Sequence, residues 1–396
     1  MTDTQAGRDA AATAAPTVGV VAESGADERR VALVPKAVSA LVGSGVAVVV
    51  ETGAGDRALL TDDLYTAAGA TIGDAWAADI VVKVAPPTAA EVARLRPGQT
   101  LVGFLAPRNA DNQIDALKAA GVQAFAVEAI PRISRAQVMD ALSSQANVAG
   151  YKAVLLAASE STRFFPMLTT AAGTVKPASL LVLGVGVAGL QAIATARRLG
   201  AMVKAYDVRS DTKEQAESLG AQFVTLKSAI EATGQGGYAR ALTAEEQAAQ
   251  QSELNGIIAN SDIVITTAQV PGRRPPVLVT KAAVEGMKTG SIIVDMAASE
   301  LGGNCELSRP GKVVASANGV EIHAPLNLPS SMPTGASIFY SRNISNLLLN
   351  VVSDGAIHLD FDDEVTAATV ITNGGKVVQP ATLKLLQPAP KGGAQA

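Results

Sequence analysis

The sequence has 396 residues, 48% of them hydrophobic and 17% charged, and this length allows two domains with sizeable cores. A formal net charge of −4, the lack of a basic block and an aromatic content of 3% exclude nucleic acid as an expected partner. One cysteine excludes an internal disulfide, and with only two histidines we expect no metal site.

Short apolar runs alternate with helical patterns in the first third of the chain. Residues 1–16 lack a basic start and an apolar segment, so we predict a flexible tail and no signal peptide. The alternation that follows indicates parallel βαβ units and a first doubly wound α/β domain. The expected strands are Val18–Ala22, Ala47–Glu51, Ile80–Val84, Thr100–Phe104 and Val122–Val127, and the expected helices include Lys36–Val42 and Gln113–Ala120.

A long helical pattern follows over residues 134–159, with Ser134 placed to cap its first turn. This length is unusual within one globular domain, so we expect the helix to bridge two domains. By local pattern alone, Arg132, Arg135 and Asp140 are the charged residues of a helix start.

The most informative stretch is residues 180–207, where an apolar run meets three glycines and a second helical pattern. Gly184 lets the chain turn out of a strand, and Gly186 lets the backbone approach a pyrophosphate. Gly189 lets the helix pack closely on the sheet, while the helix N-terminus presents N–H groups to an anion. The spacing predicts a dinucleotide site.

A second apolar run ends at Asp207, about 20 residues beyond the glycines, where such a unit places the acid that binds ribose hydroxyls. A carboxylate there repels a 2′-phosphate, so the sequence favours NAD(H) over NADP(H). Arg209 nearby works against that preference, because a guanidinium attracts phosphate.

The second domain continues through apolar strands at residues 221–226, 262–267, 291–295 and 312–315. Residues 266–268 follow one of these strands, where open α/β sheets bind ligands. Asp295 ends another strand, and a capping role and a site role are equally compatible with that place. The glycine-rich segment around Tyr238 is, from its pattern alone, a surface loop or a lid.

An amphipathic pattern over residues 334–353 predicts a helix that returns to the first domain, with Ile338, Ile344, Leu347, Leu348 and Val351 on its apolar face. Residues 364–372 and 376–378 flank an Asn-Gly-Gly turn and predict a β-hairpin. We therefore predict two doubly wound, Rossmann-like α/β domains, with the NAD-binding one (143–329) inserted into the first (17–142 with 330–385).

Several stretches together resemble the alanine dehydrogenase and nicotinamide nucleotide transhydrogenase family, over about residues 18–380. They are Glu28–Pro35, Val82–Val84, Ala171–Thr174, the glycine turn and Asp295–Ala297. Within that family, residues 131–140, 143–151 and 236–239 are similar to the NAD(H)-binding component of the proton-translocating transhydrogenases.

This resemblance implies direct hydride transfer between NAD(H) on this chain and NADP(H) on a partner subunit, coupled to proton passage through transmembrane subunits. It implies catalytic roles for Arg132, Gln137 and Asp140, and a lid at residues 236–239. It also implies a homodimer, cytoplasmic and peripheral on the inner face of the membrane. The expected cofactor contacts are Ser143, Gly184, Gly186, Val187, Gly189, Asp207, Val208, Arg209, Tyr238, Thr266, Ala268 and Gln269.

Two alternatives stay open, a soluble alanine dehydrogenase and a non-catalytic NAD-binding module. The resemblance implies that alanine dehydrogenases bind the pyruvate carboxylate with an Arg at the position of Arg30 and use a Lys at the position of Lys83 for the keto-acid chemistry, and this sequence keeps both residues. Phe104, however, stands where their acid–base histidine is expected. Amine oxidation needs a group that shuttles protons near neutral pH, which phenylalanine cannot do.

Overall fold

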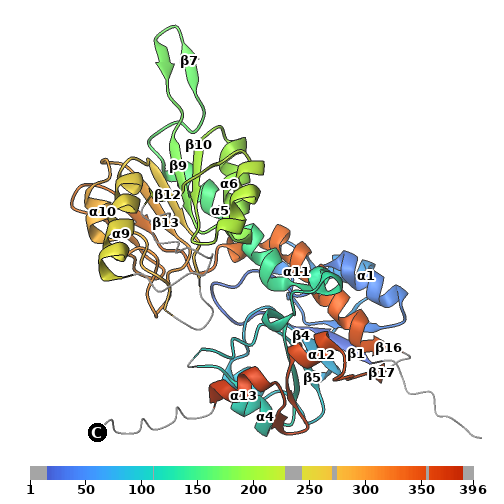
Figure 1. The fold of residues 1–396 in the computed structure, drawn as a ribbon. Helices are drawn as coiled ribbons and strands as arrows, with labels where there is room; N and C mark the ends of the chain where they lie inside the picture. Colours follow the sequence, from blue (N-terminus) through green and yellow to red (C-terminus); the bar gives the residue numbers. More distant parts are fainter. Residues whose placement is uncertain (1–15, 110, 228–242, 270–273, 354–355, 387–396) are drawn as a thin grey trace, which may run out of the picture. The chain divides into compact units, whose positions relative to one another are not determined.

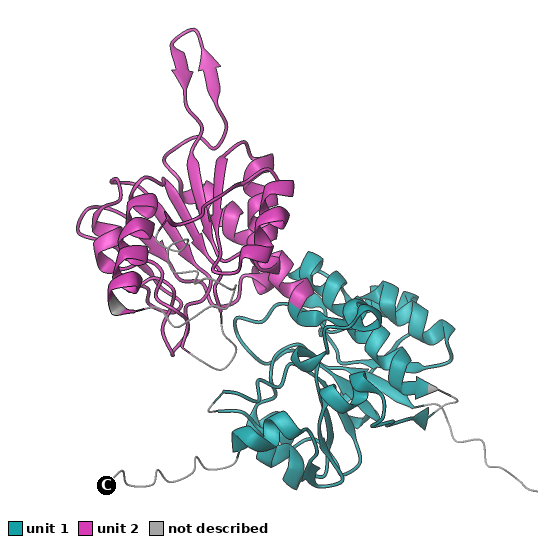
Figure 2. Cartoon of the chain, in the orientation of Figure 1, with its two compact units in different colours: residues 1–142, 333–396 teal, residues 143–332 magenta. Residues whose placement is uncertain are grey.

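The computed structural model describes residues 16–109, 111–227, 243–269, 274–353 and 356–386 (Figure 1). The chain divides into two compact units, which Figure 2 colours separately. Unit 1 comprises residues 1–142 and 333–396, and unit 2 comprises residues 143–332. Each unit is built on one large sheet.

The sheet of unit 1 has eight strands in the order β19-β18-β6-β5-β4-β1-β2-β3. The first six strands of the chain pair in parallel, whereas β18 joins β6 in antiparallel fashion. The strands are β1 Thr17–Val20, β2 Ala47–Val50, β3 Thr71–Ile72, β4 Ile80–Val82, β5 Thr100–Gly103, β6 Gln123–Ala126, β18 Val370–Asn373 and β19 Lys376–Val377. The helices are α1 Pro35–Gly43, α2 Asp62–Ala67, α3 Ala89–Val92, α4 Ile114–Ala119, α11 Pro333–Val351, α12 Glu364–Thr369 and α13 Pro380–Leu386, and β16 Val352–Ser353 pairs with β17 Ala356–Ile357.

The sheet of unit 2 has seven strands in the order β11-β10-β9-β12-β13-β15-β14. All pairs are parallel except β14 with β15, and the strand order reverses at β9. The strands are β9 Ser179–Leu183, β10 Met202–Tyr206, β11 Gln222–Phe223, β12 Ile263–Thr266, β13 Ile292–Asp295, β14 Val313–Ala315 and β15 Glu321–His323. The helices are α5 Ala141–Glu160, α6 Val187–Arg198, α7 Lys213–Ser218, α9 Ala244–Ala259 and α10 Lys281–Glu285.

Alternate residues of β9 point to opposite faces of its sheet, as strand geometry requires. Leu180 and Val182 pack with α5 and α6, whereas Leu181 and Leu183 pack with α9 and α10. Helices therefore cover both faces of the sheet (Figure 1). This arrangement and the insertion of unit 2 into unit 1 confirm the predicted fold class.

Helix α11 returns to unit 1 as predicted, because Ile344, Leu347, Leu348 and Val351 are buried in the core that surrounds β1 and β2. The prediction that Ile338 shares this buried face is wrong, since that side chain is 39% exposed. Two predicted element boundaries differ from those of the structure by six residues or more.

The helix predicted from Ser134 begins only at Ala141. Residues Ser134–Met139 form a 3₁₀ helix without a side-chain cap, and Asp140 then breaks the helical path with a ψ of 86°. In the predicted hairpin, the first strand begins at Val370, because Asp363 caps helix α12 by accepting a hydrogen bond from the amide of Thr366.

A second hairpin, β7 (Leu168–Thr170) with β8 (Gly173–Val175), was not predicted from the sequence. It projects from unit 2, and every residue in both strands is exposed (Figure 2). Among the described residues, no helix has the length and apolar content needed to cross a membrane.

Candidate functional site

The glycine turn joins β9 to α6 at the point where the strand order of unit 2 reverses. Gly184 has a φ of +101°, in the region that favours glycine, and its amide donates to the carbonyl of Tyr206 at 2.8 Å. A Cβ on Gly189 would lie 2.0 Å from the carbonyl oxygen of Gly184, so only glycine permits this approach of helix to strand.

Gly186 differs from both, because a Cβ built on it meets nothing within 4 Å. The residue stands at the N-cap of α6, whose first N–H groups have no partner within the helix. An anion placed at this terminus would face those groups and the positive end of the helix dipole. The open space over Gly186 thus fits the predicted pyrophosphate.

Asp207 follows β10 directly and lies beside the glycine turn. Its Oδ2 accepts a hydrogen bond from the amide of Val185 at 2.7 Å, and both carboxylate oxygens accept from Arg209. Burial raises the pKa of Asp207, but the hydrogen bonds from Arg209 and Val185 outweigh that effect and leave the pKa below its usual value. The carboxylate is therefore ionised at neutral pH, the form that accepts hydrogen bonds from hydroxyl groups.

The end of β12 completes the glycine-turn region of the site. The Thr267 hydroxyl donates to the Gly184 carbonyl at 2.9 Å, and the Thr267 amide donates to the Leu183 carbonyl at 2.8 Å. Thr266 is fully buried, and its hydroxyl donates to Asp295 at 2.9 Å. Any contribution of the Thr266 side chain to ligand binding is consequently indirect.

Asn304 was not singled out from the sequence, yet it holds Ala268 on both sides. Its Oδ1 accepts from the Ala268 amide at 3.0 Å, and its Nδ2 donates to the carbonyls of Ala268 and Pro276 at 2.9 and 2.7 Å. The side chain is fully buried. Asn304 therefore fixes the backbone at one predicted nucleotide contact.

Asp295 supports the same loop from below. Four groups donate to its carboxylate, namely the Thr266 hydroxyl, the Ala297 amide, the Cys305 amide and the Ser308 hydroxyl, at 2.6 to 3.0 Å. Asp295 has no exposed surface. This places it in a capping role, beneath the site surface.

Burial raises the pKa of the neighbouring Cys305 thiol to about 11, which keeps the thiol protonated at neutral pH.

The other predicted contacts in unit 2 lie at the surface. Val187 is 41% and Val208 is 80% exposed, and Gln269 is exposed with its Nε2 donating to the Met296 carbonyl at 2.7 Å. Gly150, also not singled out, brings α5 against the first turn of α6, since a Cβ there would lie 2.1 Å from the Ala188 carbonyl oxygen. Tyr238 and the predicted lid at residues 236–239 lie outside the described residues.

The predicted catalytic residues belong to unit 1. Arg132 precedes the 3₁₀ helix Ser134–Met139, Gln137 lies within it and Asp140 ends it; Arg132 and Gln137 are exposed and Asp140 is half-buried. Ser143 begins unit 2 and is also half-buried.

Residues distant in sequence hold this 3₁₀ segment on unit 1. The Asn343 side chain of α11 donates to the Val138 carbonyl at 2.9 Å, and Arg135 pairs with Asp363. The segment is therefore anchored on the C-terminal elements of the same unit.

Arg30 and Lys83 are buried and paired inside unit 1. Arg30 contacts Glu28 at 2.6 Å, and Lys83 contacts Glu23 at 3.1 Å. Burial raises the pKa of Glu23 against the attraction of Lys83. Phe104 packs against Tyr340 with ring centres 5.6 Å apart, and its own phenyl ring cannot transfer a proton.

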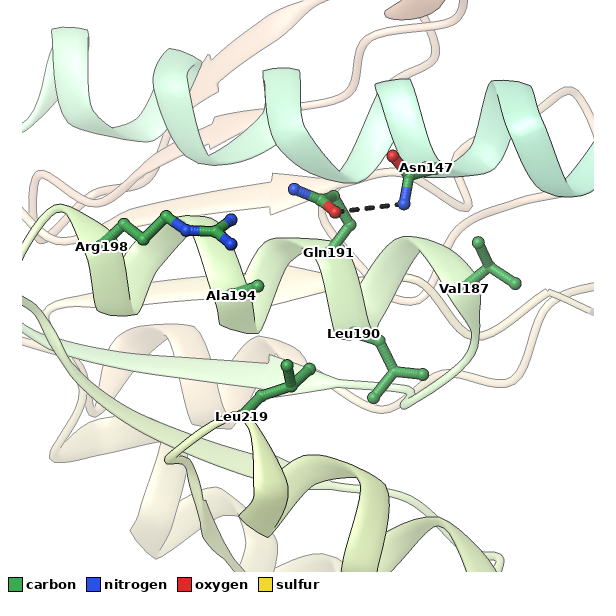
Figure 3. A pocket seen from close by; sticks show the side chains of 7 residues that line it. All are labelled: Asn147, Val187, Leu190, Gln191, Ala194, Arg198 and Leu219. Atoms are coloured by element: carbon green, nitrogen blue, oxygen red, sulfur yellow. Dashed lines mark hydrogen bonds between the residues drawn. The ribbon is translucent and has the colours of Figure 1, made fainter. Parts of the chain in front are cut away.

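A hollow of about 320 Å³ runs along α6, with the Asn147 amide donating to Gln191 at 3.1 Å on its rim (Figure 3). Val187 is the one predicted site residue that lines it, and none of the three glycines of the turn is among the lining residues. In the described segments of the chain, no group of His, Cys, Asp or Glu side chains is arranged to hold a metal ion.

Comparison with known proteins shows the family to which the chain belongs. Residues 19–149 match the N-terminal domain model of the alanine dehydrogenase/PNT family, and residues 153–380 match its C-terminal domain model. The chain is 46% identical to an NAD(P) transhydrogenase subunit alpha protein of Rhodospirillum rubrum, over 89% of this chain and 95% of that protein.

A transhydrogenase structure from Sinorhizobium meliloti superposes with a TM-score of 0.80 at 43% identity, covering 92% of this chain and 99% of the other. An alanine dehydrogenase from Mycobacterium tuberculosis is 32% identical, over 85% of this chain and 88% of that protein. The chain thus belongs to the alanine dehydrogenase/PNT family and is more similar to its transhydrogenase alpha subunits than to its alanine dehydrogenases.

Proposed function

We propose that this chain binds NAD(H) in unit 2 and exchanges hydride directly with NADP(H) held by a partner subunit. The proposal rests on one observation: the Asp207 carboxylate is joined to the glycine turn by the hydrogen bond that it accepts from the Val185 amide. That contact sets a ribose acceptor beside an anion-binding helix terminus, as a dinucleotide requires. The higher identity to transhydrogenase subunits selects the reaction.

The bound nicotinamide supplies the hydride chemistry, and the chain supplies binding, orientation and exclusion of water. Arg132 and Asp140 would orient the nicotinamide side of NAD(H), and Gln137, with both a donor and an acceptor, would reach the second nucleotide. The buried pairs of Arg30 and Lys83 and the phenylalanine at position 104 speak against the alanine dehydrogenase alternative.

The partners in this proposal are an NADP(H)-binding domain and the transmembrane subunits of the same complex. Direct transfer to NADP(H) needs a second nucleotide site, and the sequence carries one dinucleotide fingerprint. Coupling to proton passage would place the chain at the cytoplasmic face of a membrane, held there by those subunits.

Hydride transfer tests the proposal directly. The purified chain is mixed with the isolated NADP(H)-binding partner, NADPH and an NAD⁺ analogue. We expect reduction of the analogue by NADPH, measured as the absorbance of the reduced analogue. The chain alone should form no NADH from L-alanine and NAD⁺, which separates it from an alanine dehydrogenase. Binding of NADH without turnover in either assay would instead favour a non-catalytic module.

The exposed hairpin supports the homodimer. Met167, Leu168 and Val175 are 63%, 37% and 50% exposed, and an isolated two-stranded hairpin is marginally stable in water. A second copy that covers these side chains would remove apolar surface from water.

Replacing residues 167–176 with Gly-Gly is therefore expected to convert a dimer to a monomer in sedimentation velocity. The hairpin lies outside both large sheets, so its removal should leave the fold of each unit intact. The thermal midpoint of the monomeric variant should therefore match that of the wild-type chain diluted until its dimer dissociates. An unchanged sedimentation coefficient would contradict the role of the hairpin.

A further inference from the structure

The carboxylate of Asp207 is saturated by donors from its own chain. Oδ1 accepts from the backbone amide and Nε of Arg209 at 2.9 and 3.0 Å, and Oδ2 accepts from the Val185 amide and Arg209 Nη2 at 2.7 and 3.0 Å. A carboxylate offers about four acceptor positions. A ribose hydroxyl can therefore bind Asp207 only after one of these donors leaves.

The donors differ in how readily they can leave. Two are backbone amides, fixed by the glycine turn and by the turn after β10. The other two belong to the guanidinium of Arg209, whose side chain is 55% exposed, while that of Asp207 is 7% exposed. These two guanidinium nitrogens contact one carboxylate oxygen each, as the two hydroxyls of a ribose diol would.

We propose that Arg209 is an internal competitor for the ribose-binding carboxylate, and that NAD(H) binding displaces its guanidinium from Asp207. The inference rests on the proposed function, because it takes Asp207 as the ribose acceptor. Before NAD(H) binds, the two guanidinium nitrogens of Arg209 occupy the acceptor positions that the two ribose hydroxyls would take. Arg209 then opposes NAD(H) binding, and the two backbone donors stay in place throughout.

The same pair sets the choice between NAD(H) and NADP(H). Asp207 repels a 2′-phosphate and at the same time holds the cation that would attract one. Removing the carboxylate would release the Arg209 guanidinium beside the ribose position, where it can bind phosphate through a charge-assisted, two-point contact.

Arg209→Ala tests the competition, because it removes the guanidinium and keeps the backbone donor. The Arg209 side chain is largely exposed, and ion pairs at a protein surface contribute about 0.2–1 kcal/mol, so the Kd for NADH, measured by fluorescence titration of the full chain, is expected to fall about 1.4- to fivefold. Arg163→Ala is the matched control, since Arg163 is 47% exposed and contacts Asp262 at 3.1 Å. Asp262 directly precedes β12, so this ion pair lies at the amino ends of the strands, whereas the glycine turn lies at their carboxyl ends. The control variant should leave the Kd unchanged.

Asp207→Ser tests the choice of nucleotide. NADH binding should weaken, and the Kd for NADPH should fall by about tenfold or more, since a hydrogen bond to a charged group contributes about 1.5–3 kcal/mol. The double variant Asp207→Ser/Arg209→Ala should lose this gain for NADPH.

The results separate the two proposals. A wild-type chain that fails to bind NADH contradicts the proposed function. A wild-type chain and Arg163→Ala that both bind NADH, beside an Arg209→Ala that binds equally or more weakly, overturn the competition and make Arg209 a direct contact or a bystander. Persistence of the NADPH gain in the double variant would overturn its assignment to Arg209.

Discussion

Gly186→Ala is expected to raise the Kd for NADH at least about tenfold, because the new methyl group stands between the pyrophosphate and the N–H groups of α6. The fold should tolerate the change. A Cβ at Gly186 meets nothing within 4 Å, and its φ of −86° suits alanine. Loss of a glycine at an N-cap costs at most about 1 kcal/mol. Fluorescence titration and urea unfolding measure the two effects.

Gly189→Ala is the matched variant, three residues further along the same turn. Its Cβ would lie 2.0 Å from the Gly184 carbonyl oxygen, so α6 must move off the sheet. Overpacking of this kind costs about 1–3 kcal/mol, more than the roughly 1 kcal/mol that alanine gains over glycine in a helix. Both the urea midpoint and NADH affinity should fall. Equal loss of stability in the two variants would contradict separate roles for these glycines.

The glycine turn shows what can be predicted from the sequence and why. The requirements of Gly184 and Gly189 are steric and local, so three glycines at fixed spacing between a strand and a helix predict the turn. The alternation of apolar runs predicts the parallel strands of both sheets for a similar reason, since the periods of strands and helices are set by residues that are close in sequence.

Features that depend on distant residues could not be predicted in this way. Asp140 ends a good helical pattern in a segment whose Val138 carbonyl is held by Asn343, 205 positions away in the sequence. Asn304 reaches Ala268 across 36 positions, from a loop without any period. The presence of Arg209 near Asp207 was visible in the sequence, but its two-point contact with the carboxylate was not.

Roles at the site depend on the same distinction, and Asp295 is the sharpest case. Its position at a strand end is equally compatible with a ligand contact and with a cap. The structure buries it fully beneath four donors, which come from three stretches of the chain. Asp295 would therefore act on NAD(H) through the Thr266–Ala268 backbone that it supports.

Asp295→Ala is expected to lower the free energy of unfolding by about 3 kcal/mol, because several buried donors lose their acceptor at once. Its Kd for NADH should rise by about tenfold, the cost of one hydrogen bond to the nucleotide when the end of β12 shifts. Urea unfolding and NADH titration, both on the full chain, measure these changes.

Asp262→Ala separates positioning from loss of stability. Asp262 also links two strands, since its carboxylate accepts hydrogen bonds from the Ser179 amide and hydroxyl at 2.9 and 2.8 Å. This contact lies at the amino ends of β9 and β12, away from the glycine turn at the carboxyl end of β9. Removal of the Asp262 carboxylate should destabilise unit 2 and leave the Kd for NADH unchanged. If both variants weaken NADH binding in proportion to their loss of stability, Asp295 is merely structural. If only Asp295→Ala weakens it, the cap beneath Thr266 positions the nucleotide.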